Sequence, residues 1–300
     1  MNINGMSDRN IELFEKYISL VNAELDLIYK KISSNMKEEV CIAEAMNYSC
    51  SAGGKRIRPV LVLEFCRMCG GNVENAFSAA CAIEMIHTFS LIHDDLPCMD
   101  NDDFRRGKPS CHKAYNESLA LLAGDALENL ACKIIVNDNR INDSVKVKLI
   151  SVLTKATDEM IRGQVIDTEN EGKPLSEELL LRMYRMKTGA LLKAACVMGC
   201  ICAESDSSTE KRAADYAIDL GLAFQIVDDV LDIIGTKELL GKPIGSDADK
   251  GKTTFASLNG VEKAEKYASE LTEKAMVQLD GFNDNEFMKE LTVYLLKRNK

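Results

Sequence analysis

The chain has 300 residues, a mass of 33.2 kDa and a formal net charge of −10. Hydrophobic residues make up 46% and charged residues 28% of it, which are ordinary values for a globular protein and exclude a disordered chain. The acidic balance argues against a general nucleic-acid or anionic-membrane binder. Basic residues that cluster in such a chain therefore need a local explanation.

Helical patterns run through almost the whole chain. Apolar residues recur at three- and four-residue spacing, Pro is rare, and alternating strand patterns are absent. Gly-, Asn- and Ser-rich breaks separate the predicted helices. In chain order, the clearest predicted helices are Asn10–Ser33, Asn75–Leu96, Glu117–Val136, Ser144–Thr168, Ser176–Ala203 and Thr209–Ile233. The chain is therefore predicted to be all-α.

The predicted helices are long, which favours one large helical bundle of about ten or more helices. No linker rich in Pro, Gly or Ser divides the chain, so residues 1–300 are predicted to form a single domain. The N-terminal segment alternates charged and apolar residues, unlike a signal peptide. No apolar run reaches the roughly 18 residues of a membrane span. These features predict a soluble, cytoplasmic protein.

Cysteine is abundant, with 11 residues against only 3 His. Most of the Cys lie in apolar runs, so they are predicted to be small buried side chains in a reducing compartment. Cys66 and Cys69 form a CxxC pair, but no second pair follows nearby. A zinc or redox site at this pair is the weaker alternative.

Two acidic clusters end predicted helices, where the helix dipole favours cations rather than carboxylates. In the second cluster, Asp228 and Asp232 lie four residues apart and share one helix face, with Asp229 beside them. In the first cluster, Asp94 and Asp100 would not share a face on a straight helix. Pro97 lies between them and must stop or kink the helix, which could bring Asp100 back toward Asp94.

Apolar residues flank both clusters, so neither cluster lies on a simple polar helix face. Carboxylates in such surroundings need a partner that compensates their charge. Oxygen ligands without Cys or His suit Mg²⁺, which typically takes one or two carboxylates together with substrate phosphates. The alternative for each cluster alone is a solvated acidic helix end.

Basic residues also cluster near Gly-rich turns and near the acidic clusters. Gly53–Pro59 is a Gly-rich turn that carries Lys55, Arg56 and Arg58. The other cations near Gly turns or acidic clusters are Arg105, Arg106, Lys187, Lys242, Lys250 and Lys252. Cations of this kind beside Mg²⁺-type ligands indicate phosphate binding. Taken singly, Arg56 and Lys250 are expected to be solvated loop residues.

Ordered motifs match a known family. They are GGKRIRP, HTFSLIHDDLPCMDNDDFRRGKPSCH, LLAGDAL, GQVID, MKTGALL, GLAFQIVDDVLDIIG and DADKGKTTF. On these motifs the chain resembles the trans-isoprenyl diphosphate synthases, most closely the bacterial farnesyl diphosphate synthases. The resemblance covers about residues 40–260 and implies a helical bundle around a central cavity. It also implies a homodimer.

The resemblance implies a role for each matched residue. Magnesium ions, three per active site with substrate bound, would be held by Asp94, Asp95, Asp100 and Asp228, with Asp229 and Lys187 completing the catalytic set. The allylic diphosphate (dimethylallyl or geranyl) would be bound by Arg105, Lys187, Thr188, Gln225, Lys242 and Lys252. Isopentenyl diphosphate would be bound by Lys55, Arg58, His87 and Arg106. Gln164 and Asp167 would face the cleft or support it from behind, and His93 and His112 are expected to be structural.

The implied activity is a chain-elongating prenyl transfer that makes farnesyl diphosphate. The alternatives are a geranylgeranyl diphosphate synthase, a class I terpene cyclase and a non-catalytic partner subunit. A cyclase needs no second diphosphate site, whereas this chain carries the Lys55, Arg58 and His87 group. A non-catalytic subunit would have lost motif Asp or Arg residues, and here they are present.

Product length is predicted from Phe89. This residue lies five before Asp94, about 7 Å down the helix from the metal-binding cluster. A bulky ring at this depth can close the floor of a tunnel after three isoprene units, while Ser90 leaves the upper tunnel open. The alternative for Phe89 is ordinary core packing.

Overall fold

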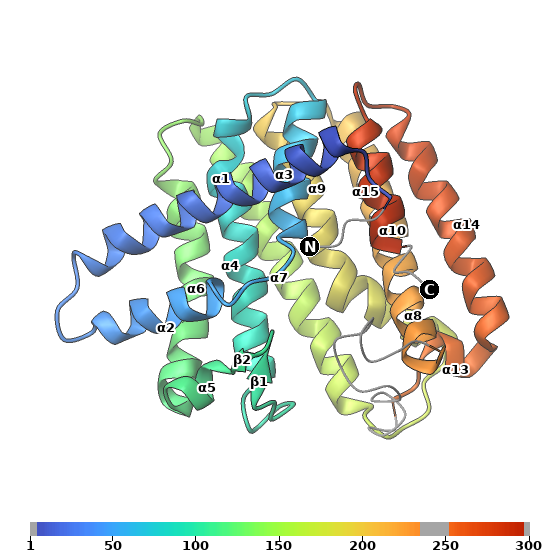
Figure 1. Cartoon of the computed structure of the whole chain (residues 1–300), viewed down its shortest axis with the longest axis horizontal. Helices are drawn as coiled ribbons and strands as arrows, with labels where there is room; N and C mark the ends of the chain where they lie inside the picture. The colour runs from blue at the N-terminus through green and yellow to red at the C-terminus, as the bar shows by residue number, and fades with distance from the viewer. Residues whose placement is uncertain (1–4, 235–251, 297–300) are drawn as a thin grey trace.

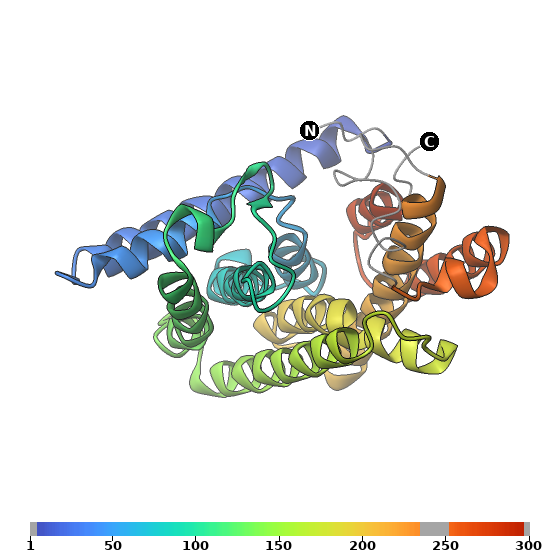
Figure 2. The ribbon, with the colours of Figure 1, turned by 90° about the horizontal axis from the view of Figure 1, so that it is seen from below.

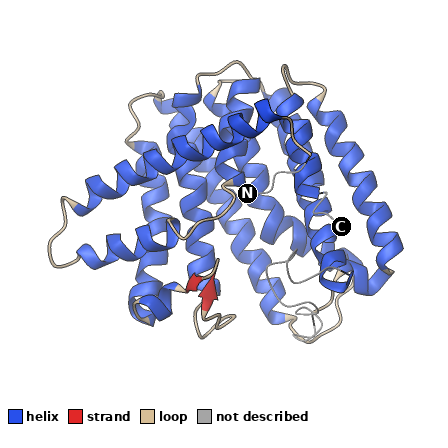
Figure 3. Cartoon of the chain, in the orientation of Figure 1, coloured by secondary structure: helices blue, strands red, loops and turns tan. Residues whose placement is uncertain are grey.

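The computed structural model describes residues 5–234 and 252–296. Helices account for most of this part of the chain, which confirms the all-α prediction (Figures 1 and 3). The elements are α1 (Asp8–Ser33), α2 (Val40–Cys50), α3 (Ile57–Met68), the 3₁₀ turn η1 (Val73–Ala76), α4 (Phe77–Asp94), β1 (Phe104–Arg105), β2 (Lys108–Pro109), α5 (Cys111–Ala114), α6 (Glu117–Val136), α7 (Asp143–Glu169), α8 (Glu177–Tyr184), the π-helical segment η2 (Arg185–Gly189), α9 (Ala190–Cys202), α10 (Ser207–Ile234), α13 (Phe255–Asn259), α14 (Val261–Leu279) and α15 (Glu286–Leu296).

Side-chain caps define where several helices begin. The side chain of Asn116 accepts a hydrogen bond from the backbone N–H of Leu119 at 2.8 Å, which starts α6. Asn142 does the same for Val145 at 3.0 Å at the start of α7. Each such cap satisfies a backbone donor that the helix itself leaves unpaired and is worth about 1 kcal/mol.

Helix α4 lies in the middle of the bundle, with the other helices around it (Figure 2). The segment Val73–Asp94 is long and apolar enough to cross a membrane by length and composition, with a mean hydropathy of 1.2. The sequence predicts no membrane span, because no unbroken apolar run reaches the required length. However, 72% of this stretch is buried inside the protein, as expected for a core helix rather than a membrane span. The site residues at the end of α4 therefore stand on a rigid central element.

The predicted helix Ser176–Ala203 contains an interruption. The structure places α8, the π-helical segment η2 and α9 along this span, so the backbone widens at Arg185–Gly189. Single π turns inside α-helices occur frequently at functional sites. A second difference is small: the predicted loop after the first acidic cluster forms an antiparallel hairpin in which Phe104 pairs with Pro109.

Two hydrophobic clusters hold the bundle together. The larger one joins α1–α4, α6, α7 and α9 to parts of α10, α14 and α15. The smaller one packs α8 and α13 against α10 and α14. Helix α10 contributes side chains to both clusters, and η2 connects α8 of the smaller cluster to α9 of the larger one. The polar residues of η2 and α10 are therefore held in place by both clusters.

Candidate active site

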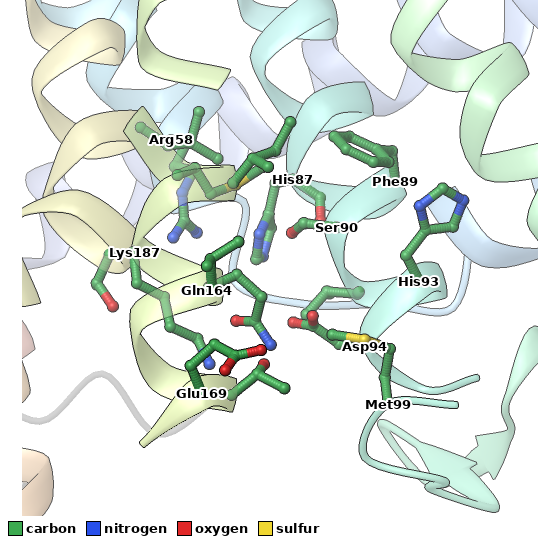
Figure 4. Close-up of a pocket in the computed structure, with 17 residues that line it drawn as sticks. Arg58, His87, Phe89, Ser90, His93, Asp94, Met99, Gln164, Glu169 and Lys187 are labelled. Atoms are coloured by element: carbon green, nitrogen blue, oxygen red, sulfur yellow. The ribbon is translucent and has the colours of Figure 1, made fainter. Parts of the chain in front are cut away.

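A cavity of about 490 Å³ opens beside the C-terminal end of α4, between α4, α7 and η2 (Figure 4). Charged residues gather with apolar ones around it. Its lining residues are Arg58, His87, Phe89, Ser90, Leu91, His93, Asp94, Met99, Met160, Ile161, Gln164, Val165, Thr168, Glu169, Lys187, Thr188 and Leu191. Figure 4 shows Arg58 beside His87, and Asp94 across the cavity from Gln164 and Lys187. The cavity thus combines an apolar interior with charged groups that can bind anions or cations.

The chain turns back at the end of α4. Helix α4 ends at Asp94, and the backbone N–H of Asp100 donates to the carbonyl of Asp94 at 2.8 Å. Asn101 adopts a left-handed conformation, with φ of 53°, and its N–H donates to the carbonyl of Leu96. The expected return of Asp100 toward Asp94 across the Pro97 break is therefore confirmed.

Asp94 lies at the cavity wall in a partly dehydrated position. Burial raises the pKa of its carboxyl to about 6, the cation of Lys187 opposes this, and the nearby Asp100 carboxylate adds to it. A carboxylate held in this way gains from any cation that binds between it and Asp100.

Asp95 points to a different partner. Its carboxylate is only 2% exposed and forms an ion pair with the guanidinium of Arg105, which also reaches Asp102 at 3.3 Å. Burial raises the pKa of Asp95, and the hydrogen bonds and charge of Arg105 partly offset it. Two residues assigned above to metal and substrate thus neutralise each other.

Arg58 and His87 line one corner of the cavity, and the charges of Arg58 and Arg106 act on His87 there. The Nε of Arg58 is buried and has no hydrogen-bond partner among the residues that the structure describes. Burial lowers the pKa of Arg58 to about 10, with Glu84 opposing and Arg106 adding to the effect. Burial, together with the charges of Arg58 and Arg106, also holds the pKa of His87 well below its usual range. An orphaned, dehydrated cation next to other cations fits an anionic ligand.

The Gly-rich turn before α3 brings Arg106 to this corner. The guanidinium of Arg106 donates to the carbonyl of Gly53 and packs flat against Gly54. A Cβ on Gly54 would lie 2.6 Å from the Arg106 guanidinium carbon, and the φ of Gly54 is +118°. The backbone conformation therefore favours glycine here, whereas the guanidinium at the flexible end of Arg106 could move away from a Cβ.

The expectation that Arg56 is a solvated loop residue is wrong. Arg56 is buried: its guanidinium binds Glu84 at 2.6 Å and the carbonyl of Cys50 at 2.6 Å. The sequence pattern could not show this, because the partner Glu84 lies on the central helix α4 far along the chain. Lys55 sits over the ring of Tyr294 at 5.3 Å, outside the cavity lining.

Asp167 holds two cations together. Its Oδ2 lies 2.5 Å from Nζ of Lys187 and 3.3 Å from Nζ of Lys252. Burial works against a charged Asp167, but the two lysines outweigh it, so its pKa is lowered. Burial likewise opposes the charge on Lys252, yet Asp167 and Asp100 raise its pKa. This carboxylate occupies the position between two cations that a bound phosphate could take.

A smaller cavity of about 130 Å³ shares Lys187 and Thr188 with the main one. It brings Gln225, Asp229 and Lys252 to the same place. The hydroxyl of Thr188 donates to Oε1 of Gln225 at 2.9 Å, which links η2 to α10. Most of the predicted allylic contacts therefore gather around the π-helical segment.

The second acidic cluster lies on α10. Asp229 is 2% exposed; one of its oxygens accepts hydrogen bonds from the Tyr184 hydroxyl at 2.7 Å and the Phe255 N–H at 2.9 Å. Asp228 is half-buried and Asp232 is buried, one helical turn apart as predicted. Lys242 and Lys250 lie outside the described residues.

Phe89 and Ser90 both line the cavity. The Phe89 ring is 6% exposed and meets the His93 ring edge-on, with centroids 5.1 Å apart. The Ser90 hydroxyl donates to the carbonyl of His87 at 2.9 Å, so it stays close to its own helix. A large and a small side chain thus stand next to each other in the cavity wall.

Residues 39–294 match the polyprenyl synthetase family. The chain belongs to this family. It is 47% identical to a geranylgeranyl pyrophosphate synthase of Capsicum annuum over 84% of this chain and 69% of that protein. It is 40% identical to a farnesyl diphosphate synthase of Micrococcus luteus over 98% of this chain and 100% of that protein.

The fold agrees with solved members. A geranyltransferase structure from Legionella pneumophila superposes with a TM-score of 0.86 at 32% identity, covering 97% of this chain and 98% of that one. The resemblance stated from the motifs is therefore confirmed. Relatives of both product names occur, so family membership leaves the product length open.

The donor set of this polyprenyl synthetase fits magnesium bound together with a phosphate. Within residues 5–234 and 252–296, no three His, Cys, Asp or Glu side chains converge into a ready-made cation site. Asp94 and Asp100 nevertheless come together at the cavity, and Mg²⁺ usually takes few carboxylates and completes its shell with water and substrate oxygens.

Some lining residues were not singled out from the sequence. Thr168 and Glu169 follow Gln164 on α7 and line the same cavity. Helical spacing could have found Thr168, which lies four residues after Gln164. Met99 is a residue of an irregular turn, and no periodic signal marks it.

Proposed function

We propose that this chain condenses isopentenyl diphosphate with dimethylallyl and then geranyl diphosphate to make farnesyl diphosphate. The observation that carries the proposal is one apolar cavity with two separate polar corners. Arg58 and His87, with Arg106 nearby, make one corner, and Asp94 with Lys187 belongs to the other. Two anion sites are what a reaction between two diphosphates requires, and a cyclase needs only one.

The residues divide the work between the two corners. Arg58 supplies a donor that has no partner among the described residues, and His87 and Arg106 lie near it. Lys55, which sits over Tyr294 outside the cavity lining, is the fourth proposed residue for isopentenyl diphosphate. Lys187, Thr188, Gln225, Lys252 and Arg105 bind the allylic diphosphate, as Lys242 does. Lys187 and Lys252 turn from Asp167 to the incoming phosphate, so Asp167 keeps these cations in place beforehand.

Asp94, Asp95, Asp100 and Asp228 would hold three Mg²⁺ ions together with the diphosphate, and Asp229 supports them through its bonds to Tyr184 and Phe255. When bound, magnesium neutralises the charge that develops on the departing diphosphate. The apolar wall of the cavity excludes water from the allylic cation, which water would otherwise trap as an alcohol.

The corner with Arg58 and His87 holds isopentenyl diphosphate so that its double bond lies next to C1 of the allylic substrate. The double bond then attacks the allylic cation at C1. The released diphosphate accepts the proton that is then lost. Phe89 limits growth to fifteen carbons because its buried ring lines the cavity beside Ser90. The alternative is a twenty-carbon product, which the names of the geranylgeranyl relatives favour.

The proposal includes a homodimer, as the family resemblance implies. It also includes a cytoplasmic location and residues 1–300 as one domain, as the sequence patterns predict. Light scattering on the purified chain tests the dimer.

An assay with isopentenyl and dimethylallyl diphosphates and Mg²⁺ tests the activity. After dephosphorylation, chromatography should show farnesol as the main product. Geranylgeraniol would move the product assignment to twenty carbons. Cyclised hydrocarbons would favour a cyclase, and no turnover of either substrate would favour a non-catalytic subunit.

A further inference from the structure

Four cysteines gather where α3 and α9 end, and none of them lines the cavity. Cys66 and Cys69 lie at the end of α3, and Cys200 and Cys202 lie in the last turn of α9. The Sγ atoms of Cys69 and Cys200 are 3.6 Å apart. Arg58 lies at the other end of α3, so this cluster is distant from the corner with Arg58 and His87 in sequence and along the helix.

Two glycines allow the close packing of α3 and α9 that brings the two sulfur atoms together. A Cβ on Gly199, next to Cys200, would lie 2.5 Å from the carbonyl oxygen of Val62 and 2.7 Å from Cβ of Phe65. A Cβ on Gly71 would lie 2.7 Å from Sγ of Cys66. The backbone of α9 at Gly199 therefore packs directly against α3. Disulfides need this kind of proximity, since their Cα atoms are usually about 4.4–6.8 Å apart.

The two thiols differ in ways that suit a reactive pair. Cys69 is half-buried and can meet a small solute, whereas Cys200 is buried. The hydrogen bond with Cys200 lowers the pKa of Cys69, and the same bond raises the pKa of Cys200. The thiolate is the nucleophilic form of cysteine, so the more accessible sulfur is also the more reactive one.

Cys66 is the competing partner for Cys69 because the two form the CxxC sequence. Its sulfur faces the carbonyl of Asn72 at 3.5 Å, and burial raises its pKa to about 12. This thiol is therefore engaged and weakly acidic, which favours Cys200 over Cys66.

We propose that Cys69 and Cys200 are a site of reversible oxidation to a disulfide that ties α3 to α9. Hydrogen peroxide is the oxidant: the Cys69 thiolate attacks one of its oxygens, an S–O bond forms, the O–O bond breaks and hydroxide leaves. The Cys200 sulfur then attacks the Cys69 sulfenic acid, the S–S bond forms, and the oxygen leaves as water with the Cys200 proton. The two thiols lose two electrons, and the peroxide gains them.

The direct experiment treats the full chain with dilute hydrogen peroxide and maps its disulfides by mass spectrometry without reduction. We expect a linked pair of peptides that contain Cys69 and Cys200, and its loss after dithiothreitol. Exclusive formation of a Cys66–Cys69 bond, or Cys69 oxidised to sulfinic acid while Cys200 remains a thiol, would overturn the proposal. Cys98→Ser, which removes an exposed thiol, is the matched control and should leave the link unchanged.

A second measurement does not depend on peptide recovery. A bond between Cys69 and Cys200 closes a long loop and restricts the unfolded chain. Oxidation should therefore raise Tm by about 5 °C or more. Cys200→Ala should abolish this rise and leave Cys69 as a sulfenic acid that dimedone traps. An equal rise in the Cys200→Ala variant would show that another pair is responsible.

Discussion

Arg58 has the least satisfied environment of the predicted substrate residues. Its buried Nε has no hydrogen-bond partner within residues 5–234 and 252–296, and burial lowers the pKa of Arg58 to about 10 while the charge of Glu84 opposes the effect. Leaving a buried charged donor unpaired costs about 1–3 kcal/mol or more. A bound anion would recover this cost, which is why this residue anchors the proposed isopentenyl site.

Asp94 is the residue that links the helix end to the proposed metal. Replacing Asp94 with Ala should lower kcat at least about 100-fold, because it removes charge stabilisation used in the transition state. The measurement is steady-state turnover with both diphosphates. Asp103→Ala, which removes an exposed carboxylate from the same loop, is the control and should retain kcat. Near-normal turnover of Asp94→Ala would remove this carboxylate from the mechanism.

Phe89 carries the product-length prediction. Phe89→Ala should deepen the cavity and shift the products toward geranylgeranyl diphosphate and longer chains. Phe77→Ala is the matched control because Phe77 lies on the same helix but does not line the cavity. Chromatography of dephosphorylated products measures the shift. If Phe89→Ala still makes only the fifteen-carbon product, another residue forms the floor.

At the scale of elements, the Gly-rich turn is held by a buried ion pair. Arg56→Ala leaves Glu84 buried without its partner, so the free energy of unfolding should fall by about 3–5 kcal/mol. Denaturant unfolding measures it. Arg162→Ala, which breaks an exposed pair with Asp158, should change stability by less than about 1 kcal/mol. An equal, small effect in both variants would mean that the turn does not depend on Arg56.

The π-helical segment depends on the absence of a side chain on α7. A Cβ on Gly163 would lie 2.4 Å from the backbone N of Lys187. Gly163→Ala should therefore displace η2, lower stability by about 1–3 kcal/mol and raise KM for the allylic substrate. Thr154→Ala, at an exposed position of the same helix, is the control. Unchanged KM in Gly163→Ala would show that Lys187 does not need this packing.

At the scale of the molecule, periodicity and breaker residues predicted most of the helices, including Glu117–Val136 to the residue. The break at Pro97 also predicted that Asp100 returns toward Asp94, because proline cannot continue the helix. What could not be predicted depends on distant partners. The burial of Arg56 needs Glu84, and the Asp95–Arg105 pair needs the hairpin. The π-helical segment was missed for another reason, because no Gly- or Pro-rich break in the sequence marks it.

The account claims that two diphosphates bind at separate corners of one cavity. The most direct test measures both KM values for Arg58→Ala and for Lys187→Ala. Arg58→Ala should raise the KM of isopentenyl diphosphate about tenfold or more, since a charged hydrogen bond is worth about 1.5–3 kcal/mol, and barely change the allylic KM. Lys187→Ala should do the reverse. If both variants raise the same KM, or both values equally, the two-site account is contradicted.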